Sequence, residues 1–214
     1  MTQIYPLPSD LHIGHRGHEV ARLTEAIPLA AGELSLLVGL NGAGKTTLMK
    51  TICGIIPPLG GKIPDARTFY LPEDLEFPGE LTPAQIAAAT LCLDAEARAW
   101  SERIAEKLGV MLNKPYAHLS KGNRQKVRVW LSESIARQRG CVLLCLDEPM
   151  TGLDCQARDA LMELWASDRT VLRIISLHPS ELPSYTDRII VVSGQKINAI
   201  PGDTKWENIR PLLQ

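Results

Sequence analysis

Continuous apolar runs recur along the chain, and several end in a glycine or a polar residue. Four of them are residues 34–38, 68–71, 141–146 and 171–177. Runs of this length without alternation are typical of strands buried on both faces of a parallel sheet. Two further runs, 188–192 and 196–200, flank a short turn and indicate a hairpin. The pattern therefore predicts an α/β fold with a central sheet.

Between the second and third of these runs, the sequence has the pattern of helices instead of strands. Thr82, followed by a proline and by Gln85, has the form of a capping box, which predicts a helix to about residue 93. A second helix is predicted over 94–108, capped by an aspartate and stopped by a glycine. A third begins near Asn123. We expect its cations Arg124, Lys126 and Arg128, opposite an apolar face, to be solvated.

The chain is expected to form one domain over residues 1–214. Its 214 residues suffice for one well-buried core but are short for two. We assign 1–81 and 139–214 to a phosphate-loop NTPase sheet core with an N-terminal antiparallel β region, and 82–138 to an inserted helical subdomain. There is no internal repeat.

Composition narrows the function classes. The formal net charge is −1, from 23 Lys and Arg against 24 Asp and Glu, so no global basic field favours a nucleic-acid partner. No apolar run reaches the ~18 residues of a membrane span, and residues 1–6 have no signal-peptide pattern. We therefore expect a cytosolic chain that does not bind nucleic acid.

Histidines and cysteines do not combine into a metal site in this sequence. His12, His15 and His18 have no carboxylate or cysteine at a ligand spacing, so we interpret them as hairpin or surface residues. The five cysteines lie in apolar segments, which favours reduced thiols in the core over disulfides.

Residues 39–47, which directly follow the first apolar run, fit the motif G-x-x-x-x-G-K-[ST]. Glycines let the backbone approach a phosphate while N–H groups and the positive end of the next helix face it. The alternative is a glycine-rich turn with a chance lysine, but the full motif between strand and helix favours nucleotide binding. The predicted binding residues are Asn41, Gly42, Ala43, Gly44, Lys45, Thr46 and Thr47, with Thr46 as a Mg²⁺ ligand.

Three more polar groups stand at the ends of predicted strands. Asp147 is the expected Mg²⁺ carboxylate, and Glu148 can act as the general base toward water. His178 is placed to hold the γ-phosphate or the base, and we group it with Glu148 and Lys45 as catalytic. The alternatives are a helix-terminal acid pair and a buried structural histidine.

These motifs resemble those of the ATP-binding cassette (ABC) transporter ATP-binding subunits, and the resemblance covers nearly the whole chain. Residues 39–47 match the family's Walker A motif, 142–148 its Walker B motif, and 151–154 its D-loop. Residues 119–123 resemble the family's signature sequence, and His178 stands where its switch histidine belongs. The resemblance implies that Ser120, Gly122 and Asp154 contact nucleotide as well.

The chain departs from the family pattern in three places. Its signature carries Lys121 and Asn123 instead of a glycine and a glutamine, and Glu73 replaces the Q-loop glutamine. Glu73 is either a further Mg²⁺ ligand or a surface acid. No aromatic residue occupies residues 15–18, where the family stacks adenine, so we expect weak base selectivity.

The resemblance implies an ATPase that dimerises head to tail, as a homodimer or heterodimer, around two ATP with Mg²⁺. It would power a separate integral membrane permease and lie at the inner face of the membrane through that partner. Leu75, Phe77 and Leu81 either receive a permease helix or pack the helical subdomain onto the core. A soluble cassette ATPase without transport, and a nucleotide-gated scaffold with little hydrolysis, are the alternatives.

Overall fold

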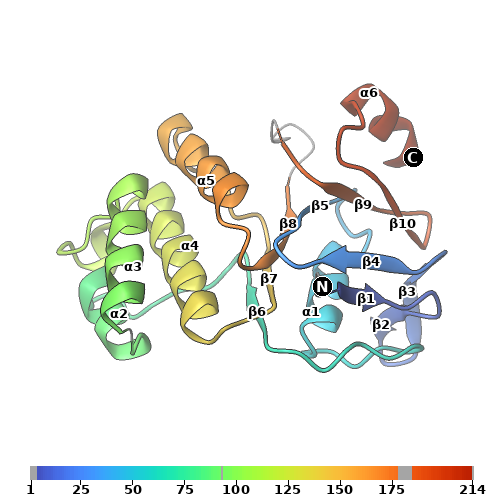
Figure 1. Ribbon diagram of the computed structural model, residues 1–214, viewed down its shortest axis with the longest axis horizontal. Coiled ribbons are helices and arrows are strands. Elements are labelled where there is room, and N and C mark those ends of the chain that lie inside the picture. The colour runs from blue at the N-terminus through green and yellow to red at the C-terminus, as the bar shows by residue number, and fades with distance from the viewer. Residues whose placement is uncertain (1–3, 93, 178–184, 214) are drawn as a thin grey trace.

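Strands and helices of the computed structural model build an α/β fold, described over residues 4–92, 94–177 and 185–213 (Figure 1). The strands are β1 (Ile4–Leu7), β2 (His12–His15), β3 (His18–Leu23), β4 (Ile27–Ala30), β5 (Leu34–Gly39), β6 (Thr68–Leu71), β7 (Leu143–Leu146), β8 (Leu172–Ser176), β9 (Arg188–Ser193) and β10 (Lys196–Pro201). The helices are α1 (Lys45–Ile52), α2 (Pro83–Thr90), α3 (Ala95–Leu108), η1 (Tyr116–His118), α4 (Lys121–Gln138), α5 (Cys155–Ser167), α6 (Trp206–Ile209) and η3 (Arg210–Leu213).

One sheet of the described residues has eight strands in the order β2-β3-β10-β9-β5-β8-β7-β6, and β1 pairs with β4 in a second sheet. The strands β9, β5, β8, β7 and β6 run parallel to one another, and β10 runs parallel to β3, whereas the pairs β2–β3 and β9–β10 are antiparallel. All residues of β5 and β7 are buried, as their continuous apolar sequences predict. The carboxyl ends of these strands therefore lie at one edge of the sheet.

Figure 1 shows α2, α3 and α4 grouped at one end of the molecule, beside β6 and away from β1 and β2. Local signals set the ends of these helices. Thr82 and Gln85 form the predicted capping box, and α2 stops at Thr90 rather than near residue 93. Gly109 ends α3 in the left-handed conformation. The helix α4 begins at Lys121 and not near Asn123, because Ser120 accepts the first-turn N–H as its N-cap.

The helix α1, which follows the phosphate-loop motif, has only eight residues. It ends at Ile52, and Gly54 then adopts a positive φ of 71°. Ile55 therefore leaves the helix and is 57% exposed.

The prediction that the cations of α4 are solvated is wrong for Arg128 and Lys126. Arg128 is 8% exposed, and Lys126 forms an ion pair with Asp154 at 2.7 Å. Buried cations of this kind require partners, which acidic and carbonyl groups of neighbouring segments supply.

The prediction that the five cysteines are thiols in the core is confirmed for only some of them. Cys141 and Cys145 are buried and Cys53 is half-buried, but Cys92 and Cys155 are exposed. All five are free, because none of them forms a disulfide in the described structure. The three histidines His12, His15 and His18 belong to the β2–β3 hairpin. Within it, His12 Nδ1 lies 2.8 Å from the carboxylate of Glu19.

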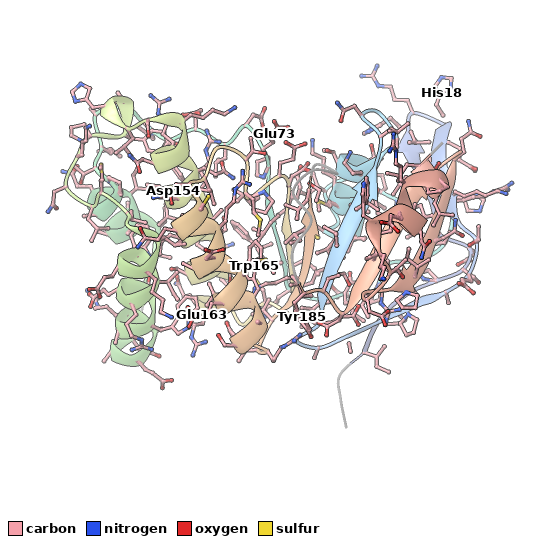
Figure 2. The ribbon with its side chains drawn as sticks, turned by 90° about the horizontal axis from the view of Figure 1, so that it is seen from above. His18, Glu73, Asp154, Glu163, Trp165 and Tyr185 are labelled. Carbon is pink, nitrogen blue, oxygen red and sulfur yellow. The ribbon has the colours of Figure 1, made fainter. Side chains whose placement is uncertain are left out.

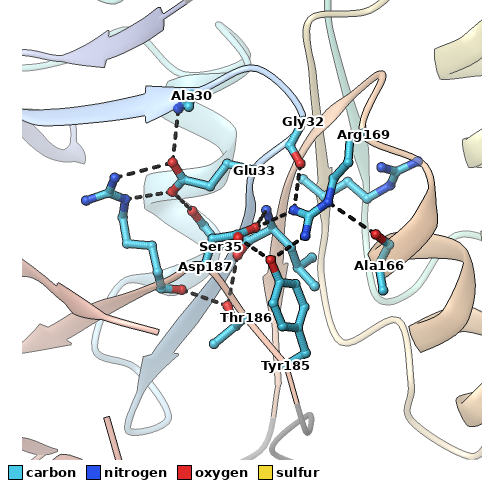
Figure 3. Close-up of polar contacts among 12 residues, drawn as sticks. Ala30, Gly32, Glu33, Ser35, Ala166, Arg169, Tyr185, Thr186 and Asp187 are labelled. Atoms are coloured by element: carbon cyan, nitrogen blue, oxygen red, sulfur yellow. Dashed lines mark hydrogen bonds and ion pairs between the residues drawn. The ribbon is translucent and has the colours of Figure 1, made fainter. Parts of the chain in front are cut away.

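A polar network fixes the starts of β5 and β9 (Figure 3). Asp187 accepts hydrogen bonds from the Leu34 N–H at 2.8 Å, from Arg169 at 2.6 Å and from the hydroxyl of Tyr185. Beside it, Glu33 accepts from Arg188 at 2.6 Å. The network ties adjacent parallel strands together where they begin, so that their opposite ends meet in register.

Candidate active site

The loop between β5 and α1 contains two glycines in the left-handed region. Gly42 and Gly44 have φ values of 81° and 109°, which L side chains rarely adopt. A Cβ on Gly44 would also lie 2.6 Å from Val20, and one on Gly39 would lie 2.7 Å from the carbonyl of Val192. Glycine is therefore required both for conformation and for close packing, and a glycine-rich loop before a helix can offer backbone N–H groups to an anion.

Lys45 is the first residue of α1. Its Nζ donates to the carbonyl oxygens of Gly39 at 2.9 Å and Leu40 at 3.2 Å, so the ammonium lies across the loop. Asn41 is exposed, whereas Ala43 and Thr47 are half-buried. Thr47 meets the β2–β3 hairpin, with its hydroxyl 3.3 Å from His15 Nε2.

Three hydroxyl groups from three elements converge on Asp147. Thr46 donates at 2.7 Å, Tyr70 at 3.0 Å and Ser176 at 2.6 Å, and Asp147 is only 5% exposed. Burial, and then the charge of Asp147, raises the pKa of the Tyr70 hydroxyl, which keeps it a donor. Carboxylate and hydroxyl oxygens are the ligands that Mg²⁺ prefers, so this pairing of Thr46 with Asp147 fits that ion.

Tyr70 and Ser176 were missed by sequence reasoning. The signal was present, since each is a polar residue inside an apolar strand run, and such a residue needs a buried partner.

Glu148 follows Asp147 with its backbone in the left-handed region, at φ 47°. This conformation costs a non-glycine residue about 1–2 kcal/mol, so other contacts have to hold it. Its N–H donates to Ser176 at 2.8 Å, and its carbonyl accepts from Gln125 at 3.3 Å. Its carboxylate accepts from Thr151 at 3.1 Å. These three contacts hold Glu148 in its left-handed conformation directly after Asp147.

Glu73 lies two residues after the end of β6, near the acid pair. Partial burial of its carboxyl group raises its pKa, the nearby Glu148 and Asp147 raise it further, and Lys121 opposes the shift. The structure thus brings Glu73 close to Asp147 and Glu148, although its side chain remains exposed to solvent (Figure 2).

Ser120, Gly122 and Asp154 form a second group at the starts of α4 and α5. Asp154 accepts from the Ala157 N–H at 2.8 Å as the N-cap of α5. The hydrogen bond from Lys126, followed by that helix N–H, lowers the pKa of the Asp154 carboxyl. Figure 2 shows Glu73 between Asp154 on one side and His18 at the opposite end.

His178 lies outside the described residues. Phe77 and Leu81, expected to be exposed if they receive a partner, are half-buried and pack against the core, with the Phe77 ring edge-on to Tyr116 at 5.4 Å. Their packing role therefore has direct support. No helix in the described ranges has the length and apolar character that crossing a membrane requires.

Sequence comparison places these motifs among known proteins. A family model described as ABC transporter matches residues 26–151. The chelated iron transport system membrane protein YfeB of Yersinia pestis is 29% identical, over 90% of this chain and 72% of its own. The aliphatic sulfonates import ATP-binding protein SsuB 1 of Pseudomonas syringae pv. tomato is 31% identical, over 80% of this chain. This chain spans 64% of that protein, slightly less than two thirds.

Solved structures share the fold. The ATP-binding subunit of an ABC transporter superposes with a TM-score of 0.80 at 23% identity, over 98% of this chain and 99% of the other. The cbiO1 protein from Clostridium perfringens, part of the ABC transporter complex cbiONQ, gives 0.72 at 20% identity, over 98% and 92%. Together, the matched family model, the phosphate loop and the acid pair identify the chain as a member of the ABC transporter family, with the phosphate-loop NTPase fold of its ATP-binding domains.

Proposed function

We propose that this chain binds and hydrolyses ATP with Mg²⁺, and that two such cassettes close head to tail around two ATP molecules. The observation that carries the proposal is the hydrogen bond between Thr46 of the phosphate loop and the buried Asp147, at 2.7 Å. It joins the phosphate-binding helix to the residue that directly follows β7, and the next residue along the chain, Glu148, is the proposed base.

Each group has a distinct role in this mechanism. The loop residues 41–47 bind the phosphates through N–H groups, and Lys45 releases its carbonyl partners to neutralise phosphate charge. Thr46, Asp147 and Glu73 would hold Mg²⁺, which neutralises the developing charge when bound. Glu148 accepts a proton from the attacking water, and Thr151 orients its carboxylate. We retain His178 as a further catalytic residue.

Ser120, Gly122 and Asp154 are proposed to face the nucleotide of the partner cassette. Ser120 and Gly122 stand at the N-terminus of α4, whose positive dipole end suits a phosphate. The interface would therefore have two equivalent sites, each assembled from both cassettes.

Transport is proposed from the relatives. YfeB and SsuB 1 are named for a transport system and for import, so we propose that this chain powers a separate integral membrane permease. In that assembly it would be cytoplasmic and held at the inner face of the membrane by the permease.

Hydrolysis is tested by measuring phosphate release from ATP and Mg²⁺ by the purified chain. Glu148→Gln should lower the rate about 10²–10⁴-fold, the usual contribution of a general base, while ATP binding persists. Glu163→Gln is the matched control, because Glu163 is an exposed acid on α5 that pairs with Lys107 at 3.2 Å.

Gel filtration tests the dimer. Glu148→Gln with ATP and Mg²⁺ should elute at twice the mass of the nucleotide-free chain. A wild-type chain that binds ATP without releasing phosphate would instead support the scaffold alternative, and equal rates for Glu148→Gln and wild type would exclude Glu148 as the base.

A further inference from the structure

Arg128 is a buried cation in the middle of the polar contacts behind the proposed site. Its Nε donates to the Tyr116 hydroxyl at 3.2 Å, and its Nη1 donates to the carbonyl oxygen of Glu73 at 2.9 Å. The same Nη1 donates to Gln125 Oε1 at 3.2 Å, while Nη2 pairs with the Glu76 carboxylate. One guanidinium thus holds the backbone at Glu73 and the side chain of Gln125 together.

Gln125 carries the connection onward to the acid pair. Its Nε2 donates to the carbonyl oxygens of Glu148 at 3.3 Å and Pro149 at 3.1 Å. The orientation of the amide follows from its partners, because a guanidinium can only donate and a carbonyl can only accept. Gln125 is 4% exposed, so reversing the amide would leave unsatisfied groups on both sides.

The two ends of this connection are the segments that carry the acids. At one end Glu148 needs support, since its φ of 47° is unfavourable for a residue with a side chain. At the other end the backbone of Glu73 is held, and its carboxyl group lies near enough to Glu148 and Asp147 for their charges to act on it. Both ends are held from α4, the helix that Ser120 caps.

We propose that Arg128 and Gln125 are positioning residues that fix Glu73 and Glu148 relative to each other from the helix α4. The inference rests on the proposed ATP hydrolysis but goes beyond it, because in the described part of the chain the hydrogen bonds of both side chains go to groups outside the phosphate loop. A movement of the start of α4 would reach both acids through this connection. Disrupting the connection through Arg128 and Gln125 should slow the chemical step of ATP hydrolysis and leave nucleotide binding intact.

The test is Arg128→Lys, which keeps the charge and most of the buried stem. A lysine has one ammonium group and lacks the planar fork, so it cannot serve the carbonyl of Glu73, Gln125 and Glu76 together. We expect kcat for ATP hydrolysis to fall about tenfold with KM for ATP within twofold of wild type, since the displacement affects the base and not the phosphate loop.

Arg124→Lys is the matched control. Arg124 lies one turn earlier on α4, pairs with Glu76 at 3.4 Å and packs over the ring of Tyr116, but its hydrogen bonds go to Glu76 and to the carbonyl of Ala117. It shares the surroundings of Arg128 and not the connection to the acids. Its kcat should stay within twofold of wild type.

Gln125→Met extends the test, because it keeps the side-chain length and removes the donor to Glu148. It should lower kcat to the same degree as Arg128→Lys, and the double variant should be no slower than either, as expected for one connected path. If Arg128→Lys does not fold, Gln125→Met decides alone. Wild-type kcat in the folded variants, or an additive loss in the double variant, would overturn the inference. Absence of hydrolysis by the wild-type chain would instead refute the proposed function.

Discussion

The backbones of Gly122 and Gly152 pack directly against each other. A Cβ placed on Gly122 would lie 2.4 Å from the carbonyl oxygen of Gly152, closer than real Cβ contacts come. Gly122 belongs to the first turn of α4, and Gly152 precedes α5. The signature and D-loop segments are thus held together by backbone contact, with the pair Lys126–Asp154 beside it.

Gly122→Ala should therefore destabilise the chain by about 1–3 kcal/mol, the usual cost of overpacking. The expectation runs against helix propensity, which favours alanine over glycine by about 1 kcal/mol. Urea unfolding measures the difference. A variant as stable as wild type would show that the two segments separate easily, which would contradict a rigid contact between them.

Local sequence signals predicted much of the fold. The strand at 68–71 has the expected bounds, and the capping box of Thr82 with Gln85 is present, because residues close in sequence form both features. Helix ends were less predictable. In the sequence Ile55 follows Ile52 at helical spacing, yet α1 ends at Ile52 and Gly54 then has a positive φ.

Side chains with distant partners were the main failure. The sequence of α4 put Arg128 opposite an apolar face, which indicated solvent, but its acceptors at Glu73 and Glu76 lie 55 and 52 residues earlier. The same holds for Asp147: its strand was predicted, whereas the donors Tyr70 and Ser176 come from other strands. Such pairings depend on sheet order, which periodicity does not encode.

Removing the ammonium of Lys45 should weaken nucleotide binding. Lys45→Ala should lose a charge-assisted contact of about 1.5–3 kcal/mol, which corresponds to a roughly ten- to hundredfold weaker Kd for ATP. Calorimetric titration with ATP measures it. Lys50→Ala is the control, because Lys50 lies on the same helix and packs over the Tyr70 ring at 5.9 Å. Equal affinities for Lys45→Ala and wild type would contradict the assignment of the phosphate loop.

The pKa of Glu73 leads to a pH-dependent effect on stability. Because burial and the charges of Glu148 and Asp147 raise this pKa, the folded state favours the protonated carboxyl group. Ionisation of Glu73 therefore lowers the free energy of unfolding at pH values above the pKa that this residue has in the unfolded chain. The loss disappears as the pH falls below that pKa. Glu73→Gln should unfold at a higher urea concentration than wild type at pH 7, with a smaller difference at pH 4.

A surface acid in the same loop provides the control for Glu73. Glu80→Gln removes one charge from an exposed position, so it reports the general effect of changing net charge. If the two variants shift the urea midpoint equally at pH 7, the carboxyl group of Glu73 does not interact with the acid pair, and its assignment to the Mg²⁺ site fails with it.

Base selectivity is expected to be weak, because the hairpin beside the phosphate loop offers a histidine instead of an aromatic platform. His15 Nε2 lies 3.3 Å from Thr47, and residues 15–18 are exposed, so a base bound there would remain partly in solvent. GTP should therefore compete with ATP for the site, with a Kd within about tenfold, or ~1.4 kcal/mol, of the Kd for ATP.

The variant His15→Ala should weaken the binding of ATP and of GTP to the same degree, since an imidazole face does not distinguish the purines. Competition titrations on the wild-type chain and on His15→Ala measure both effects. A preference for ATP above about a hundredfold, ~2.7 kcal/mol, or a loss confined to ATP in the variant, would show that the hairpin recognises adenine specifically.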